Sequence, residues 1–107
     1  MNTAATNLVF HVALPAELES GRSSGSYATA SLATEGFIHC CTAEQLSGVL
    51  ERYFSNVDIY EVVTVLVDRL TKELQPVFEN TVGGTELFPH IYGAIPMWAI
   101  ERNLEPG

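Results

Sequence analysis

Residues 58 to 70, DIYEVVTVLVDRL, constrain the fold of this chain more than any other segment. They place β-branched side chains on both faces of an expected strand, whereas a strand with one face in water alternates apolar and polar side chains. A strand of this kind needs neighbours on both sides and cover on both faces. We therefore predict that it lies in the centre of a sheet.

Five further segments have the length and composition of strands and would supply its neighbours. They are LVFHVAL (8–14), GFIHCC (36–41), QPVFENT (75–81), LFPHIYG (87–93) and MWAIERNL (97–104). Proline cannot donate a hydrogen bond to a β-ladder, so Pro89 and Pro96 are expected only at edges or ends of strands. The sequence thus predicts a sheet of five or six strands.

One main helix is expected after Thr42, which forms a T-x-x-Q capping box with Gln45. Its apolar residues recur with helical spacing and predict a face turned to the core: Leu46, Val49, Leu50, Tyr53 and Phe54. A short helix is expected at residues 15–20 and an ordered loop at residues 21–36. The fold class is therefore α+β, a single domain over residues 1–107 with this helix on a mixed, mostly antiparallel sheet.

The charge balance argues against several classes of partner. Thirteen carboxylates against five scattered bases give a formal net charge of -8, which repels nucleic-acid backbones and anionic lipid. We expect no extended nucleic acid and no membrane as partner, and the oligomeric state is left open. Adjacent Cys40 and Cys41 indicate reduced thiols, and the start of the chain lacks the basic region of a signal peptide, so we expect a cytoplasmic protein.

All three histidines of the chain, His11, His39 and His90, fall on apolar faces of predicted strands. Burying an imidazole costs free energy unless both ring nitrogens are hydrogen-bonded, and burial lowers its pKa. One interpretation is three separate core histidines, each bonded to the backbone. The other is one cleft lined by all three, which requires their strands to be neighbours.

The histidines and cysteines allow two further chemistries. Three histidines allow a zinc site with an open fourth position, as in hydrolases, but no ligand pair with helical spacing is present and we expect no metal. Cysteine catalysis needs a base beside the thiol, and His39 points away from Cys40 on a strand, whereas Cys41 shares its face. A small buried thiol is the favoured interpretation for both cysteines.

Five residues near the histidines are candidate ligand contacts. The aromatic ones can stack on a ligand, the carboxylate can orient a histidine or accept a hydrogen bond from a ribose hydroxyl, and the serine can bind or cap. Each also has an ordinary structural interpretation, as core aromatic, exposed carboxylate or turn residue. They are Tyr27, Ser31, Glu35, Phe88 and Tyr92.

The order FHVAL, GSYATASLATEGFIHC, a T-A-E-Q helix and ELFPHIYGAI resembles a bacterial family catalogued as domain of unknown function 952. The resemblance covers nearly the whole chain, with GFIHC and FPHIYG as its most specific pieces. It implies a fold similar to the ADP-ribosyltransferase superfamily, which includes RNA 2'-phosphotransferases that use NAD. By that resemblance His11 would hold the nicotinamide-side ribose and amide, and His39 would be a second histidine of the pocket.

The resemblance leads to our first functional hypothesis, a transferase-like pocket for ADP-ribosyl or phosphoryl chemistry. His11, His39 and His90 would be its catalytic residues, NAD its cofactor, and a small molecule or nucleotide its substrate. However, His90 lies where many transferases have a catalytic glutamate, and Arg22 is the only basic residue near the loop. A non-catalytic module that binds a small ligand is therefore the alternative, and a three-histidine metal hydrolase is a third hypothesis.

Overall fold

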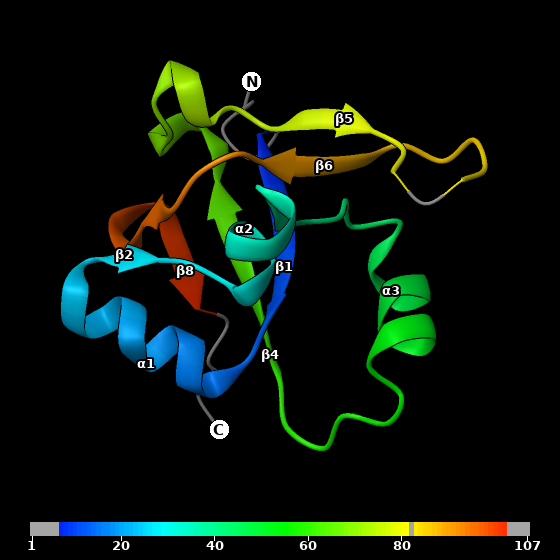
Figure 1. Cartoon of the computed structure of the whole chain (residues 1–107), viewed down its shortest axis with the longest axis horizontal. Helices are drawn as coiled ribbons and strands as arrows, with labels where there is room; N and C mark the ends of the chain where they lie inside the picture. The colour runs from blue at the N-terminus through cyan, green and yellow to red at the C-terminus, as the bar shows by residue number, and fades with distance from the viewer. Residues whose placement is uncertain (1–6, 82, 103–107) are drawn as a thin grey trace, which may run out of the picture.

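The computed structural model describes residues 7–81 and 83–102. In these residues the strands form small antiparallel sheets (Figure 1). The first sheet has the order β1-β4-β8, with β1 (Leu8–Ala13), β4 (Glu61–Leu66) and β8 (Ile100–Arg102). Strand β4 lies in the middle and buries Val63, Thr64 and Val65, so the prediction of a central strand within residues 58–70 is confirmed.

Two smaller sheets complete the described architecture. Strand β2 (Ser26–Tyr27) pairs with β7 (Ile95–Pro96), and β3 (Ile38–His39), β6 (Phe88–Ile91) and β5 (Val77–Glu79) form a sheet in the order β3-β6-β5. Mutual hydrogen bonds between the backbones of Phe10 and Cys41, of 2.7 and 2.8 Å, connect β1 to the chain just after β3. The α+β class is confirmed, but the strands divide into three sheets where one was predicted. The strands of the second and third sheets have only two to four residues, too few to extend one continuous ladder.

The two strand prolines behave differently. Pro96 ends β7 at the edge of its sheet, as predicted, but Pro89 lies inside β6, the middle strand of its sheet. The Pro89 carbonyl accepts a hydrogen bond from the Cys40 amide at 3.0 Å. Since the N–H and C=O of one residue point to the same side of a strand, the Pro89 nitrogen also faces Cys40, just beyond the end of β3. The missing N–H therefore removes no bond between β6 and β5 and leaves out only the return bond to the Cys40 carbonyl, where β3 has already ended. The prediction for Pro89 was wrong for this reason.

The region predicted as an ordered loop, residues 21–36, contains regular structure. Helix α1 (Pro15–Ser24) extends four residues further than expected, and α2 (Ala30–Glu35) follows β2. Both helices end at a glycine with left-handed backbone, Gly25 with φ of 89° and Gly36 with φ of 93°, a common helix C-terminus. The prediction of a loop was wrong because it followed the Ser and Thr content of this region. The Ala, Leu and Glu residues of ASLATE, the sequence of α2, favour a helix.

The predicted main helix forms as α3 (Leu46–Tyr53), but its apolar stripe is not part of the core. The two hydrogen bonds of the capping box are present in the turn just before α3. The backbone N–H of Gln45 donates to Thr42 Oγ1 at 3.3 Å, and the backbone N–H of Thr42 donates to Gln45 Oε1 at 3.0 Å. No residue of α3 is buried, and Figure 1 shows the helix standing apart from the sheets. The expectation of a core-facing stripe was therefore wrong, because this face borders a cavity.

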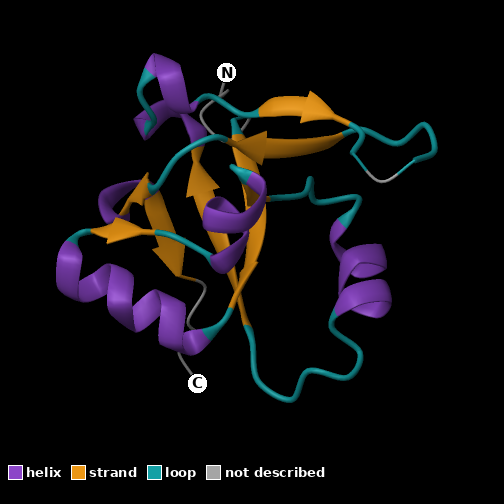
Figure 2. Cartoon of the chain, viewed as in Figure 1, coloured by secondary structure: helices purple, strands orange, loops and turns teal. Residues whose placement is uncertain are grey.

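The core is formed by buried residues of the sheets and of α1, and Figure 2 shows how these elements are arranged. Its largest fully buried side chains are Tyr27, Leu18, Ile38, Ile91, Ile95, Val63 and Val65. No helix in the described residues is long and apolar enough to span a membrane. The predicted closing strand, residues 97–104, begins as a 3-10 turn and becomes β8 at Ile100, and its last two residues lie outside the described part.

Candidate functional site

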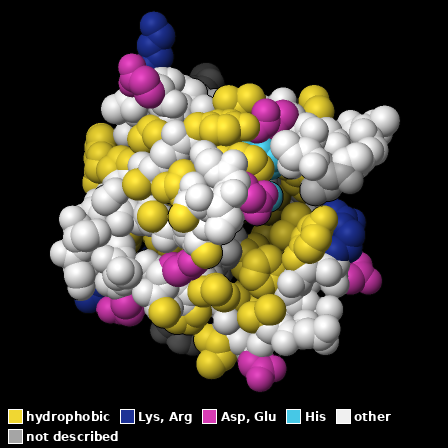
Figure 3. Space-filling view, in the orientation of Figure 1, with side chains coloured by type: hydrophobic (Ala, Val, Ile, Leu, Met, Phe, Trp, Pro, Cys, Tyr) yellow, Lys and Arg dark blue, Asp and Glu magenta, His cyan; other side chains and the backbone are white. Residues whose placement is uncertain are grey.

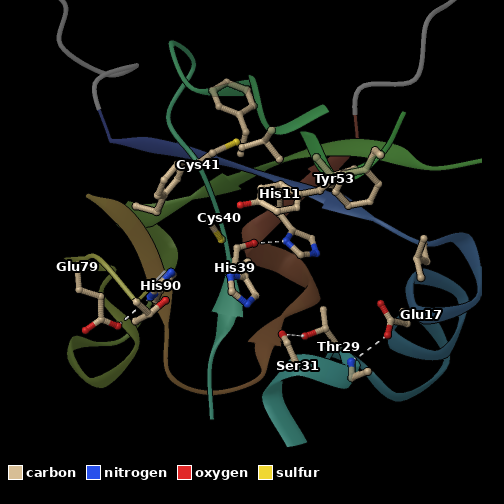
Figure 4. A pocket seen from close by; sticks show the side chains of 18 residues that line it. His11, Glu17, Thr29, Ser31, His39, Cys40, Cys41, Tyr53, Glu79 and His90 are labelled. Carbon is tan, nitrogen blue, oxygen red and sulfur yellow. Dashed lines mark hydrogen bonds and ion pairs between the residues drawn. The ribbon is translucent and has the colours of Figure 1, made fainter. Parts of the chain in front are cut away.

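A cavity of about 420 Å³ lies between α3, α2 and the strands that hold the histidines (Figure 4). Figure 3 shows the surface hollowed beside a group of hydrophobic side chains, with histidine visible near its upper end. The lining includes four aromatic side chains and the two cysteines. Among the described residues that line it, the charged ones are Glu17 and Glu79, and none is lysine or arginine. The cavity is therefore apolar with an acidic bias.

The structure brings together most of the site residues expected from the sequence. His11, His39 and His90 all line the cavity, as do Ser31 and Phe88. Their roles in binding or catalysis stay predictions. The other three candidates, Tyr27, Glu35 and Tyr92, are absent from the lining and instead hydrogen-bond to residues that are part of it.

Sequence reasoning missed the apolar wall and the two carboxylates of the cavity. Val49, Tyr53 and Phe54 of the α3 region line it, and their periodicity was the available signal, although it was assigned to the core. Glu79 had no comparable signal. Its proximity to His90 depends on the register of β5 against β6, in which Val77 faces His90 and Glu79 faces Phe88.

His11 has both ring nitrogens bonded within the protein. Its Nδ1 lies 2.6 Å from the His39 carbonyl, which can only accept, so Nδ1 carries the proton and donates. Its Nε2 therefore accepts from the Tyr27 hydroxyl, also at 2.6 Å. Burial lowers the pKa of His11 to about 4, which keeps the ring neutral. These contacts favour a structural role for His11, and neither nitrogen remains for a ribose.

At one end of the cavity the buried imidazole of His90 pairs with the carboxylate of Glu79, a side chain that is 28% exposed. His90 Nδ1 lies 2.8 Å from Glu79 Oε2, and the same oxygen accepts a hydrogen bond from the Tyr92 hydroxyl. Bonds from Tyr92 and His90 lower the pKa of the Glu79 carboxyl. The His90 ring stacks on Phe37, with ring centroids 4.1 Å apart and planes at 14°. The imidazole is thus fixed in position and tautomer.

His39 lies beside His90 but closer to solvent. The two ring centroids are 5.2 Å apart, and Phe37 also contacts the His39 ring edge to face at 4.8 Å. His39 Nε2 lies 3.2 Å from Glu35 Oε1, and the two side chains are about half exposed. His39 is therefore at the rim of the cavity, whereas the His90 side chain is only 3% exposed.

The polar groups on the α2 side of the cavity bond to one another. Ser31 Oγ donates to the Phe37 carbonyl at 2.8 Å, so its lone pair accepts from Thr29 Oγ1 at 2.7 Å. The Glu17 carboxylate accepts from the Ala30 amide at 3.0 Å and so occupies the start of α2. This wall therefore presents the negative charge of Glu17 to a ligand. The Ala30 amide is already bonded to Glu17 and does not donate to a ligand.

The two cysteines are free thiols in apolar surroundings. Cys40 is 5% and Cys41 2% exposed. Burial raises the pKa of the Cys41 thiol to about 11 and raises that of Cys40 further. Since the thiolate is the nucleophile, the site does not favour cysteine catalysis.

Thiol–disulfide exchange with an external reagent should show the same property. Cys41 should react with Ellman's reagent at least about 100-fold more slowly in the folded protein than in urea, because a pKa two units above the usual 9.0 reduces the thiolate fraction by that factor. The release of thionitrobenzoate at pH 8 measures both rates, with a Cys40→Ala variant isolating Cys41. Equal rates in the two states would contradict burial of the thiol.

The described residues contain no group of three or more His, Cys, Asp or Glu side chains that could hold a metal ion. His11, the third member of the histidine set, directs its nitrogens to His39 and Tyr27. The arrangement therefore does not favour the metal-hydrolase hypothesis.

Together, the fold and the cavity define a small α+β protein with a histidine-lined pocket. The model of the family described as "Protein of unknown function (DUF952)" matches residues 12–103, and the chain belongs to this family. The resemblance drawn from GFIHC and FPHIYG is thus confirmed at family level. The relation to ADP-ribosyltransferases stays a prediction.

Solved structures show the same fold. The crystal structure of protein CC0527 from Caulobacter crescentus is similar, with a TM-score of 0.76 and 22% sequence identity over 94% of this chain and 90% of that one. A double methionine variant of CC0527 gives the same values. No curated protein matches the chain. At this identity the likeness concerns the fold alone.

Proposed function

We propose that the cavity binds a small, mostly apolar organic molecule without an anionic group. The observation behind this proposal is the absence of lysine and arginine from the described lining, which contains Glu17 and Glu79 instead. A buried anion without a partner is strongly disfavoured. A volume of about 420 Å³ also falls within the range of small-molecule pockets.

The same observation makes NAD a less favoured ligand. Its pyrophosphate needs cations or free amides, and the Glu17 carboxylate already accepts from the amide at the start of α2. The nitrogens of His11 are engaged by His39 and Tyr27. The geometry therefore supports the ligand-binding hypothesis over the transferase hypothesis, and NAD and ADP-ribose belong in the test as competitors.

A matched pair of fluorescent probes tests the preference for ligands without negative charge. 1-Anilinonaphthalene and 8-anilinonaphthalene-1-sulfonate share one ring system and differ by a sulfonate. We expect saturable binding of the neutral probe and at least about tenfold weaker binding of the sulfonate, because the acidic lining disfavours the anion. NAD and ADP-ribose should not displace the neutral probe.

Two tryptophan substitutions locate the binding site. Val49→Trp adds bulk to the cavity wall and should abolish saturable binding of 1-anilinonaphthalene. The control Ile59→Trp changes a side chain that is 69% exposed and absent from the lining, and should leave binding intact. Displacement of the neutral probe by NAD would instead support the transferase hypothesis, and equal effects of both substitutions would place the binding elsewhere.

A further inference from the structure

The pair formed by His90 and Glu79 gives the cavity one chemically distinct end. The Glu79 carboxylate oxygen at 2.8 Å can only accept, so the proton of the neutral imidazole is on Nδ1. The lone pair of the ring is then on Nε2. The Glu79 carboxylate also lies where it can stabilise the imidazolium that forms when Nε2 takes a proton.

His90 Nε2 is in contact with open space. It makes no hydrogen bond to any residue in the ranges 7–81 and 83–102, although His90 lines the cavity. Every side-chain nitrogen or oxygen that is shielded from solvent in this part of the chain has a partner, so Nε2 is not shielded. The Phe37 ring covers one face of the imidazole, and Figure 4 shows the Nδ1 side occupied by Glu79. The side of the ring that carries Nε2 therefore faces the cavity.

Most other groups of the lining are less suited to accept a proton deep in the cavity, and the Glu17 carboxylate already accepts from the Ala30 amide. His11 has both nitrogens engaged, and Ser31 and Thr29 bond to each other. The Cys40 and Cys41 thiols are protonated because burial raises the pKa of each. His39 is paired with Glu35 at the exposed rim.

We propose that His90 is the proton-accepting residue of this cavity and that the ligand is an apolar molecule with a hydroxyl group, a phenol or an alcohol, which donates to Nε2. This proposal rests on the proposed function and specifies its ligand class. An apolar ring or chain would lie against the aromatic wall of Phe10, Tyr53, Phe54 and Phe88. The hydroxyl would lie at the histidine end, where a neutral donor pairs with the Nε2 lone pair.

The proton transfer is balanced within the site. An alcohol keeps its proton and donates a hydrogen bond to Nε2. For a phenol acidic enough to transfer its proton, the hydroxyl O–H bond breaks, its electron pair remains on the ligand oxygen, and an N–H bond forms at Nε2. The imidazolium then faces the Glu79 carboxylate on one side and the new oxyanion on the other. Tyr92 donates a second hydrogen bond to Glu79 and holds the carboxylate in place. The net charge of the complex does not change.

2-Naphthol provides a direct probe because its hydroxyl becomes strongly acidic on excitation, and the naphtholate emits at longer wavelength than the neutral form. Its partner 2-methoxynaphthalene has the same rings without the proton. We expect 2-naphthol to bind about tenfold more tightly, a difference typical of one hydrogen bond to a buried acceptor. Bound 2-naphthol should emit mainly as naphtholate.

Substitutions identify the acceptor. His90→Gln should bring the affinity for 2-naphthol down to that for 2-methoxynaphthalene and remove the naphtholate emission. The control Glu44→Gln, at an exposed residue absent from the lining, should preserve both. Glu79→Gln is a second variant that keeps an oxygen for the Nδ1 proton but removes the charge. It should retain binding of 2-naphthol and lose most of the naphtholate emission.

The outcomes separate this proposal from the proposed function. If 1-anilinonaphthalene binds but 2-naphthol and 2-methoxynaphthalene bind equally, or if bound 2-naphthol emits only as the neutral form, the proton-accepting role is wrong and the binding function stands. If none of the neutral probes binds, both proposals are wrong. Naphtholate emission that persists in His90→Gln would assign the base to another residue and overturn the role of His90.

Discussion

Replacing His11 with phenylalanine is expected to lower the free energy of unfolding by about 2–4 kcal/mol. Phenylalanine fills a similar volume, so the loss comes from hydrogen bonds and not from a cavity. The Tyr27 hydroxyl, on a side chain with 0% exposure, loses its acceptor, and the His39 carbonyl loses its donor. Each unsatisfied buried group costs about 1–3 kcal/mol. Urea denaturation followed by circular dichroism measures the change.

A double-mutant cycle with Tyr27→Phe provides the control. Tyr27→Phe alone leaves His11 Nε2 without a donor, whereas the double variant removes both partners of that bond. The double variant should therefore be destabilised by less than the sum of the two single changes. The transferase hypothesis expects the opposite pattern, in which His11→Phe leaves stability unchanged and abolishes ligand binding. That result would return His11 to the ligand site.

The central strand was predictable because its signal is local. β-branched residues on both faces of residues 58–70 indicate a strand with neighbours on both sides, and β4 lies between β1 and β8. The family was likewise recognisable from GFIHC and FPHIYG, two short runs in fixed order. In both cases the information lies within a few consecutive residues.

The cavity was not predictable from the same reasoning. Helical periodicity identifies which residues share a face, but it does not say what that face contacts. Val49, Tyr53 and Phe54 were assigned to the core, and the structure places them on the wall of a cavity.

The pairing of Glu79 with His90 depends on a contact between strands. It requires β5 to pair with β6 so that Val77 faces His90, which puts Glu79 two residues further along the same face. The sequence alone does not show whether Glu79 or Glu86, the two carboxylates near His90, pairs with it, because the choice depends on that register. The three histidines converge for a similar reason, since His39 faces His90 across β3 and β6, and the bond between Phe10 and Cys41 brings His11 beside them.

Acidification gives the second large expected effect. Between pH 6.5 and about pH 4, His11 should reduce the free energy of unfolding by about 3 kcal/mol in total. Its pKa is about 4 in the folded protein because of burial, against an ordinary value of 6.5. In this window the unfolded chain binds a proton at His11 and the folded protein does not. Lower pH therefore favours unfolding, and the contribution is fully retained only above pH 6.5.

The difference between wild type and His11→Phe isolates this contribution. Glu61 and Glu79, whose pKa values are lowered by bonds to Arg102 and to Tyr92 and His90 respectively, also lose stabilisation as the pH falls. These carboxyls are present in both proteins, so their effects largely cancel in the comparison. The free-energy gap between the two proteins, measured by urea denaturation at several pH values, should narrow by about 3 kcal/mol from pH 6.5 to pH 4. If the free energies of unfolding of the two proteins changed in parallel with pH, His11 would have the same pKa in the folded and unfolded chains. The inference of a buried neutral imidazole would then be wrong.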